Sequence, residues 1–448
     1  MKKRMIALLT VLAMGLAACG DNTPGQTENP VTETLTEQEG EEQLPYVASD
    51  KVKKLGEGLM TLEAPEEKYD DEELKALSEL YGKLFAETVA VGEKDKNVLI
   101  SPGSLMMALG MCENGAAGDT LDNMEEVLGG IDVSRMNAIL SGMAKRLESS
   151  DQVEWNVADS VWFKDDGRVQ IKDDFVQKAQ SWYDAELYMA PFDEGTLNDI
   201  NGWVSDRTKG MIPTLLDSIP GDARMYLINT LAFEGGWANE YEESDIVTDQ
   251  DFTNADGSKT KVDLLYSSED SYFTVAGGKG FVRNYKGGAY SFMGLLPEEG
   301  TDMGSFVEAL AEEDLADAVN NRKSGLVLVR IPEFSADTDL EMSSIFKAMG
   351  MDLAFDPNRA DFSDMVTILD TERIDRICIG RIIHKTHIEV DRKGTKAAAA
   401  SAVEMLDCAG AIEPVEEFVE ICLNRPFVYG IIDNATGLPV FLGVINSL

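Results

Sequence analysis

The chain has 448 residues, of which 44% are hydrophobic, and its formal net charge at pH 7 is −42. This length and composition suffice for a large buried core. So negative a surface repels nucleic acid and anionic lipid headgroups, and we therefore expect neither as a ligand of the folded part. The same charge would attract a basic partner, although solubility is also a sufficient reason for it.

The N-terminus has the pattern of a processing segment. Residues 2–4 are basic, and Met5 to Ala18 is an apolar run too short to span a bilayer. The run ends in Leu-Ala-Ala-Cys, which resembles a bacterial lipobox, with cleavage before Cys19 and acylation of that cysteine. We therefore expect a signal peptide over 1–18 and an extracytoplasmic, lipid-anchored protein at the bacterial cell surface. The alternative is an ordinary secretory signal in which Cys19 is incidental.

The next segment has the composition of a linker. Residues 19–68 are rich in Thr, Glu, Gln, Asn and Pro and contain few large apolar side chains. Such a sequence buries too little surface to offset its chain entropy. We expect a flexible, acidic tether that follows the lipidated Cys19, with local order near Leu55 to Leu62.

The remainder, residues 69–448, reads as one large domain because it contains no second linker and no internal repeat. Hydrophobic periodicity predicts helices near Glu72–Val91 and Pro102–Ala116. It also predicts strands at Met225–Phe233, Ser291–Leu296 and Gly325–Ile331. Helices and strands that alternate irregularly favour an α+β fold over a regular βαβ repeat.

A strand-like run at Ile382–Val390 is followed by an alanine-rich stretch from Gly394 to Val403. Read with the period of a strand, one face of this stretch carries only small or apolar side chains. That face consists of Thr395, Ala397, Ala399, Ser401, Val403 and Met405. The charges of Lys396 and Glu404 fall on the other face, so the stretch could enter a sheet without burying a charge. Alanines are also good helix formers, and a short helix is the alternative.

Several sequence blocks, in order, resemble the serpin family over about residue 70 to the C-terminus. They are Asn97–Pro102 with Gly118–Thr120, Asn229–Trp237, Ile331–Phe334, Ala360–Ser363, Ile388–Ala400, Asn424–Phe427 and Gly437–Gly443. The resemblance implies a serpin-like fold with a large central, mostly antiparallel sheet, further sheets, surrounding helices and an exposed reactive-centre loop. It also implies a suicide inhibitor of serine proteases, whose cleaved loop inserts into the central sheet.

The resemblance assigns roles to individual residues of this chain. The hinge of the loop would be Gly394, Thr395, Lys396, Ala397, Ala398, Ala399 and Ala400. The region where the sheet opens would contain His384, hydrogen-bonded to Ser101, Ser104 and Asn201. A second region, the breach at the entry point of the loop, would contain Trp237 and Arg392.

The spacing of inhibitory serpins places the cleaved bond fourteen residues after the hinge glycine, between Cys408 and Ala409. A small uncharged residue at 408 suits elastase-like proteases. The alternative bond is Met405–Leu406, which would suit chymotrypsin-like or subtilisin-like enzymes. The segment after Cys408 is longer than is usual in the family, which leaves both bonds open.

Charge reversals mark this chain against the family pattern. Arg392 and Lys396 stand where glutamates are frequent, and Glu234 stands where a lysine is frequent. A swapped Glu234–Arg392 ion pair is one hypothesis for how the chain compensates.

The remaining chemistry-bearing residues indicate neither an enzyme nor a metalloprotein. Only two histidines occur, His384 and His387, and strand alternation sends them to opposite faces. The chain has no nucleophile elbow, phosphate loop, zinc motif or dinucleotide fingerprint. Among the five cysteines, Cys112 and Cys378 read as small buried hydrophobes, and a disulfide between Cys408 and Cys422 is an open alternative.

We therefore expect no enzymatic activity, no cofactor and no metal. The expected partner is an extracellular serine protease, elastase-like or subtilisin-like, held in a covalent complex by a monomeric inhibitor. Membrane contact would be through the N-terminal lipid only. The alternative is a non-inhibitory, serpin-like surface lipoprotein that acts as a binding module.

Overall fold

The computed structural model describes residues 46–67, 69–148, 152–221, 223–372, 376–395 and 418–448. In these ranges seven strands form a central sheet, in the order β1-β5-β3-β6-β15-β14-β12. Their bounds are Lys53–Lys54, Glu186–Ala190, Val153–Lys164, Met225–Gly236, Gly394–Thr395, Ile382–Val390 and Phe334–Glu341. Most neighbours are antiparallel, while β3–β5 and β6–β14 run parallel. The predicted large, mostly antiparallel central sheet is confirmed.

The other described strands form two further sheets. One follows the order β16-β11-β8-β9-β10-β17-β18-β2, with β7 paired to β8, and the other consists of β13 and β4. The bounds of the first, in that order, are Val419–Cys422, Lys323–Pro332, Lys259–Val275, Gly278–Asn284, Tyr290–Leu296, Phe427–Asp433, Pro439–Ile445, Val98–Ile100 and, for β7, Ile246–Thr253. Strands β13 and β4 are Val366–Ile368 and Val169–Ile171. The predicted strands at 225–233, 291–296 and 325–331 lie within β6, β10 and β11.

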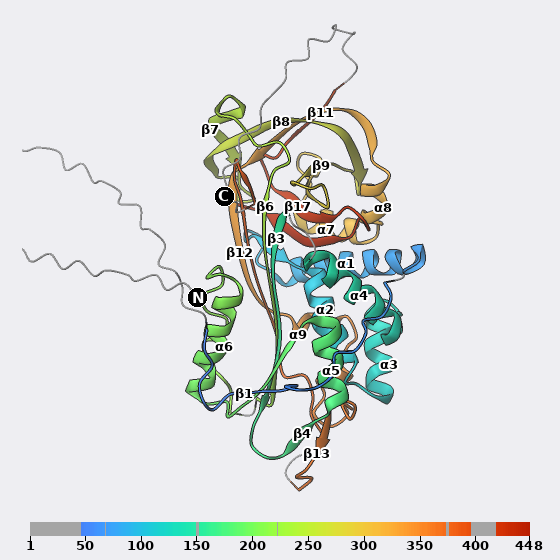
Figure 1. Ribbon diagram of the computed structural model, residues 1–448. Coiled ribbons are helices and arrows are strands. Elements are labelled where there is room, and N and C mark those ends of the chain that lie inside the picture. Colours follow the sequence, from blue (N-terminus) through green and yellow to red (C-terminus); the bar gives the residue numbers. More distant parts are fainter. Residues whose placement is uncertain (1–45, 68, 149–151, 222, 373–375, 396–417) are drawn as a thin grey trace, which may run out of the picture. The chain divides into compact units, whose positions relative to one another are not determined.

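Nine α-helices in the described ranges surround these sheets. They are α1 (Asp71–Val91), α2 (Pro102–Glu113), α3 (Gly118–Val127), α4 (Val133–Glu148), α5 (Asp173–Tyr183), α6 (Glu194–Arg207), α7 (Met303–Ala311), α8 (Leu315–Asn320) and α9 (Ser343–Ala348). Helix α6 covers one face of the central sheet, while α2 and α5 lie on the opposite side (Figure 1). This mixture of helices and sheets confirms the predicted α+β class.

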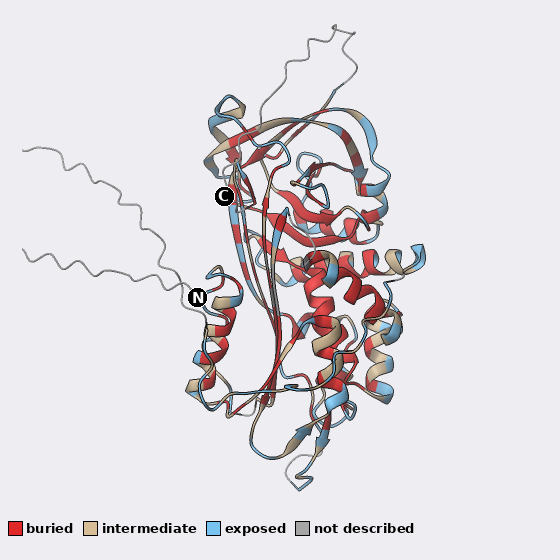
Figure 2. Ribbon diagram, in the orientation of Figure 1, coloured by how far each residue is buried: buried red, intermediate tan, exposed pale blue. Residues whose placement is uncertain are grey.

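Helix α2 passes through the core, and all twelve of its residues are buried (Figure 2). A helix that is apolar on all sides is stable only in such a position. Its start is fixed by Ser101, whose hydroxyl caps the helix by accepting from the N–H of Ser104, and by Pro102 in the first turn. The helix therefore presents Ser101 and Ser104 to the strands that cross it.

Two hydrophobic clusters lie on the two faces of the central sheet. The larger one contains Val161, Leu227 and Leu231 of the sheet together with the apolar residues of α2. The smaller one places Trp162 and Ile228 of the sheet against Trp203 of α6. Alternate residues along β3 and β6 thus face α2 and α6 in turn, as strand geometry requires.

Residues 46–67 pack on the domain, so the predicted boundary at residue 69 is wrong. Strand β1 pairs with Met189 and Tyr188 of β5, and the Leu55 N–H donates to Leu187 O at 2.8 Å. The carboxylate of Asp199 in α6 accepts from the N–H of Ser49 at 2.9 Å and from its hydroxyl at 2.6 Å. We call residues 46–67 the N-terminal strap. Its few apolar side chains that pack on the domain, Tyr46, Val52, Leu55 and Leu59, are only partly buried, which is why its composition resembles that of a tether.

Candidate functional site

The central sheet is partly opened between β6 and β14. These strands pair in parallel from Ile382 opposite Leu227 to Thr386 opposite Leu231. Farther along, residues 232–234 of β6 and 387–389 of β14 are not paired with each other, and β15 then lies between the two strands. The first two residues of the predicted hinge are therefore already a strand of the sheet. Thr395 is fully buried, so it lies on the face that its position in the alternating pattern predicts.

Glycines allow the chain to enter at this point. Gly394 and Thr395 pair with Gly236 and Gly235 at the end of β6. A Cβ atom at Gly394 would lie 2.1 Å from the carbonyl oxygen of Gly235 and 2.7 Å from the Cα of Gly236. Such distances are well inside van der Waals contact, so only glycine fits at position 394.

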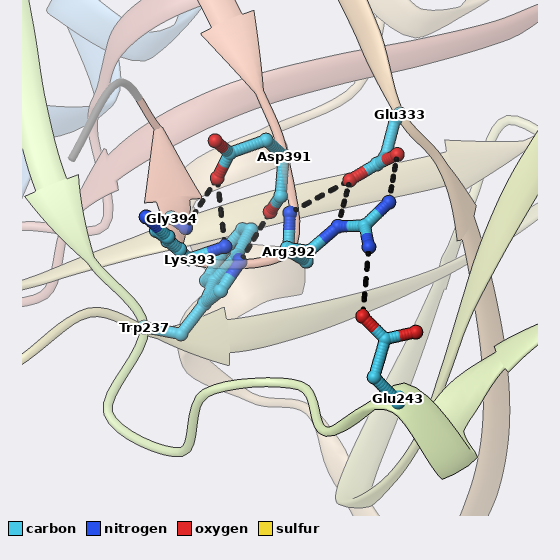
Figure 3. A network of polar contacts seen from close by, with 7 residues as sticks. All are labelled: Trp237, Glu243, Glu333, Asp391, Arg392, Lys393 and Gly394. Carbon is cyan, nitrogen blue, oxygen red and sulfur yellow. Dashed lines mark hydrogen bonds and ion pairs between the residues drawn. The ribbon is translucent and has the colours of Figure 1, made fainter. Parts of the chain in front are cut away.

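Trp237 holds the turn that joins β14 to β15 (Figure 3). Its backbone N–H donates to Lys393 O at 3.0 Å, and its indole Nε1–H donates to Asp391 O at 2.9 Å. The Asp391 carboxylate in turn accepts from the N–H groups of Lys393, at 2.7 Å, and Gly394, at 3.0 Å. The structure thus brings Trp237 and Arg392 together at the entry point, as the resemblance implied.

The ion-pair partner of Arg392 is Glu333 at the start of β12, and the hypothesis of a Glu234–Arg392 pair is wrong (Figure 3). Two contacts of 3.0 Å join the guanidinium to the Glu333 carboxylate, and a third, of 3.4 Å, reaches Glu243. The hydrogen bonds that its guanidinium donates to Glu333 raise the pKa of Arg392. Glu234 instead lies opposite Glu154 in the β3–β6 pairing, and β3 flanks β6 on the side away from β14.

His384 lies in the buried interior between β14 and α2. Its Nε2 accepts from the backbone N–H of Ser101 at 2.9 Å, which fixes the ring as the neutral tautomer with the proton on Nδ1. Burial alone lowers the pKa of His384 to about 3. The Ser101 hydroxyl donates to Val440 O at 2.8 Å and so ties α2 to β18. In the described part of the chain, His384 Nδ1 has no hydrogen-bond partner.

Asn201 does not belong to this cluster, which corrects the implied assignment. Its side chain lies in α6, donates to Leu216 O at 2.8 Å and accepts from the N–H groups of Leu215 and Leu216. The asparagine that contacts the Ser104 hydroxyl is Asn229 of β6, and its Nδ2–H donates to Asp159 Oδ1 of β3 at 2.5 Å. Period-two alternation within Met225–Phe233 groups Asn229 with the core-facing Leu227 and Leu231. A polar residue on that buried face was the signal that could have found it.

Asp159 is a carboxyl group buried at the junction of β3, β6 and α2. It is 3% exposed, and its Oδ2 has no hydrogen-bond partner among the described residues. Burial raises the pKa of Asp159 to about 7, against the lowering effect of the hydrogen bond from Asn229. Asp184 raises it further by charge repulsion. We call Ser101, Ser104, Asp159, Asn229 and His384 the sheet-opening cluster.

Comparisons with known proteins agree with this geometry. The family model "Serpin (serine protease inhibitor)" matches residues 76–448. The chain belongs to the serpin family. Serpin-Z2A of Triticum aestivum is 29% identical over 388 residues, which covers 82% of this chain and 95% of that protein. An uncharacterized serpin-like protein of Methanosarcina acetivorans is 27% identical over 370 residues, which covers 80% of this chain and 82% of that protein.

Solved serpin structures share the fold of this serpin. The crystal structure of the thermophilic serpin tengpin in its native state superposes with a TM-score of 0.81 at 34% identity, over 89% of this chain and all of that one. Tengpin in its latent state gives a TM-score of 0.73 at 32% identity, over 86% of this chain and all of that one. The described fold is therefore nearer to the native than to the latent arrangement. Serpins are generally protease inhibitors and bind target proteases.

Several predicted features of this serpin lie outside the described residues. They are Cys19, the hinge residues Lys396 to Ala400, and the candidate bonds Cys408–Ala409 and Met405–Leu406, together with any Cys408–Cys422 disulfide. Of the cysteines that are described, Cys112 is buried as predicted, while Cys378 and Cys422 are partly buried. No group of metal-ligating side chains occurs in the described ranges. Nor does any helix in them combine the length and apolarity needed to cross a bilayer.

Proposed function

We propose that this serpin is a suicide-substrate inhibitor of extracellular serine proteases of elastase-like or subtilisin-like specificity. The observation that carries the proposal is β15: the hinge begins as a two-residue strand between β6 and β14, in line with the space that a longer strand would occupy. A loop that only served as an exposed substrate would need no such starting point inside the sheet.

The register of β15 supports insertion without strain at its start. Continued in the same antiparallel register, residues 396–398 would lie between the unpaired stretches 232–234 and 387–389. Residue 399 would then meet Leu231 and Thr386, which are now paired with each other. From there the loop must separate five parallel pairs, and the residues that would do so are Ala399, Ala400, Ser401, Ala402 and Val403. Their small side chains keep the steric cost of separation low.

The chemistry is that of an interrupted acyl transfer. The protease serine hydroxyl attacks the carbonyl carbon of Cys408, the bond to the nitrogen of Ala409 breaks, and the amine leaves with a proton. An ester now joins the protease to the loop. Insertion of the freed loop would carry the protease away from the end of the sheet at which the loop enters. It would distort the protease active site before water hydrolyses the ester. The cleaved bond is part of the proposal, with Met405–Leu406 as the alternative.

The N-terminal features complete the proposal. A lipid on Cys19 would hold the inhibitor at the bacterial surface, where it would meet proteases from outside the cell. A basic binding cleft on the protease would suit the acidic residues Glu404 and Asp407 beside the candidate bonds.

The test is to mix the full chain with an elastase-like and a subtilisin-like protease and to analyse the products on denaturing gels. We expect a denaturant-resistant band at the summed mass of the protease and the clipped inhibitor. The mass of the released C-terminal peptide would identify the bond. Clean cleavage without that band by both proteases would contradict inhibition and favour a binding module with the serpin fold.

A further inference from the structure

Thr395, the second residue of β15, makes one side-chain hydrogen bond. The hydroxyl of Thr395 and the phenol hydroxyl of Tyr285 are 2.6 Å apart, and both residues are fully buried. Neither hydroxyl has another hydrogen-bond partner in the described part of the chain. This hydrogen bond is therefore the only one that offsets the desolvation cost of burying the two hydroxyls.

Tyr285 is held rigidly in this position. Its ring stacks on Trp237 with centroids 4.9 Å apart and an interplanar angle of 7°, and Phe233 packs against it at 4.8 Å. The guanidinium of Arg283 also lies over the Trp237 ring, 5.3 Å from its centroid. The space for the Tyr285 ring exists because Gly235 has no side chain: a Cβ there would lie 3.1 Å from Tyr285 Cδ1.

The backbone pairing of β15 is too short to secure the hinge by itself. It consists of Gly394 and Thr395 only. Both neighbouring strands are also paired on their other sides, β6 with β3 and β14 with β12. A short strand of this kind is marginal in water. The Asp391 carboxylate holds Gly394 within the turn, and the Tyr285–Thr395 bond is the side-chain contact that ties β15 to a residue outside that turn.

We propose that Tyr285 is a positioning residue for the inhibitory reaction, because its hydroxyl keeps Thr395 in the sheet before the loop is cleaved. This inference rests on the proposed function and names a residue that acts in it. Insertion then starts from a strand that is already in register, and each further residue extends it. Without the anchor, Thr395 leaves the sheet and the entry point between β6 and β14 must be found again after cleavage.

The anchor matters because two events compete after cleavage. Insertion traps the protease, whereas hydrolysis of the ester releases an active protease and a spent inhibitor. A slower start of insertion leaves the hydrolysis rate unchanged, so more inhibitor molecules are consumed for each protease trapped. When one hydroxyl is removed and the other stays buried without a partner, the equilibrium between Thr395 inside and outside the sheet should shift by about tenfold.

The experiment compares hydroxyl deletions at both ends of the bond in the full chain. Tyr285→Phe and Thr395→Val each remove one hydroxyl and keep the shape of the side chain. We expect each to raise the number of inhibitor molecules consumed per trapped protease, up to about tenfold, and the double variant to add little to either. Thr395→Ser, which keeps the hydroxyl, should behave like the wild type.

Tyr429→Phe is the matched control. Tyr429 is also fully buried and ring-packed, but its hydroxyl has no hydrogen-bond partner among the described residues. Removal of that hydroxyl should leave the stoichiometry of inhibition unchanged. An effect of Tyr429→Phe equal to that of Tyr285→Phe would overturn the inference, since it would show a general loss of core packing.

A second readout separates this inference from the proposed function. Hydrogen exchange of the segment around Thr395, measured on the uncleaved proteins, should be faster in Tyr285→Phe and Thr395→Val than in the wild type. Absence of trapping by the wild type would contradict inhibition, while faster exchange in the variants would still establish the anchor. Unchanged exchange and unchanged stoichiometry in Tyr285→Phe would overturn the positioning role.

Discussion

Arg392 and Glu333 form a two-contact ion pair where the turn after β14 meets the start of β12. Arg392 is about one-third exposed and Glu333 one-quarter, so solvent screens the pair. Such pairs are worth about 1 kcal/mol or less. Their geometry nevertheless fixes the turn next to the hinge, because the Arg392 backbone N–H also donates to Glu333 Oε1 at 3.1 Å.

Reversal of one charge of this pair should destabilise the uncleaved protein, and reversal of both should restore most of the loss. We expect Arg392→Glu and Glu333→Arg each to lower the free energy of unfolding by about 1 kcal/mol, because like charges then face each other. Urea unfolding of the two single variants and the double variant measures the coupling.

Glu234 provides the control for this prediction. Arg392→Glu combined with Glu234→Arg should remain as unstable as Arg392→Glu alone, since Glu234 lies opposite Glu154 and not beside Arg392. Rescue by the Glu234 variant, but not by the Glu333 variant, would contradict the assigned pair.

The stability of the native state should fall as the pH rises, because of Asp159. The folded-state pKa of this carboxyl is about 7, above its ordinary value of 3.8, so the folded protein binds the proton more tightly than the unfolded chain. Its stabilising contribution is present below about pH 4 and is lost as the pH rises through about 7. The loss amounts to about 4 kcal/mol at most. Unfolding midpoints between pH 4 and pH 8 for wild type and Asp159→Asn test this, since asparagine cannot titrate.

His384 makes the stability depend on pH in the opposite direction, so the contributions of the two groups can be separated. Its folded-state pKa is about 3, below its ordinary value of 6.5, so stability is lost as the pH falls below about 6.5. The two slopes oppose each other in the wild type between about pH 4 and 6.5. Asp159→Asn should therefore show a steeper acid-side loss than the wild type. Equal pH profiles for the two proteins would refute the assignment of Asp159.

The clipped form should gain stability from the hydroxyl of Ser401. In the register that β15 sets, residue 401 of an inserted loop would lie opposite His384 and Asn229, facing the core. The His384 Nδ1–H group has no hydrogen-bond partner among the described residues and is available to donate to this hydroxyl. We expect Ser401→Ala to lower the stability of the clipped protein by about 1 kcal/mol and to leave the uncleaved protein unchanged.

Ala400→Ser is the control for this prediction, since residue 400 of an inserted loop would lie opposite the partly exposed Lys385, on the face of the sheet turned away from α2. It should not change the stability of the clipped form. Melting curves of clipped and uncleaved samples of both variants give the comparison. An equal loss for Ser401→Ala in both samples would argue against the register.

The sequence predicted what depends on local pattern. Strand β14 has the predicted bounds Ile382–Val390, and α1 begins one residue before the predicted Glu72, at the cap set by Asp70. The alternation after Gly394 assigned Thr395 to the buried face, where it lies.

What the sequence could not supply are pairings between distant segments. The alternation within β6 marks Asn229 as a residue of the core-facing side, but whether it reaches Ser104 depends on which strand packs against α2, and the local sequence does not specify that packing. The partner of Arg392 depends on the β12–β14 register, which places Phe334 opposite Val390 and so brings Glu333 beside the turn. Glu234 and Glu333 are both acidic, and only the register determines which of them lies beside Arg392.

The N-terminal strap should contribute to the stability of the domain through Asp199 of α6. This buried carboxylate accepts from the backbone and the hydroxyl of Ser49, and also from the Tyr46 hydroxyl at 3.3 Å. Asp199→Ala leaves these donors unpaired, so we expect it to lower the free energy of unfolding by about 1–3 kcal/mol. Ser49→Ala should cost less, and the double variant should cost little more than Asp199→Ala alone, because both act on one contact.

Lys51→Ala is the matched control within the strap. Its ion pair with Asp193 is solvent-exposed and screened, so its removal should leave the stability nearly unchanged. Urea unfolding of the full chain measures all four proteins. A wild-type midpoint for Asp199→Ala would show that residues 46–67 lie on the domain without stabilising it. In that case the strap would add no more stability than the flexible tether that the sequence predicts up to residue 68, although it contacts the domain.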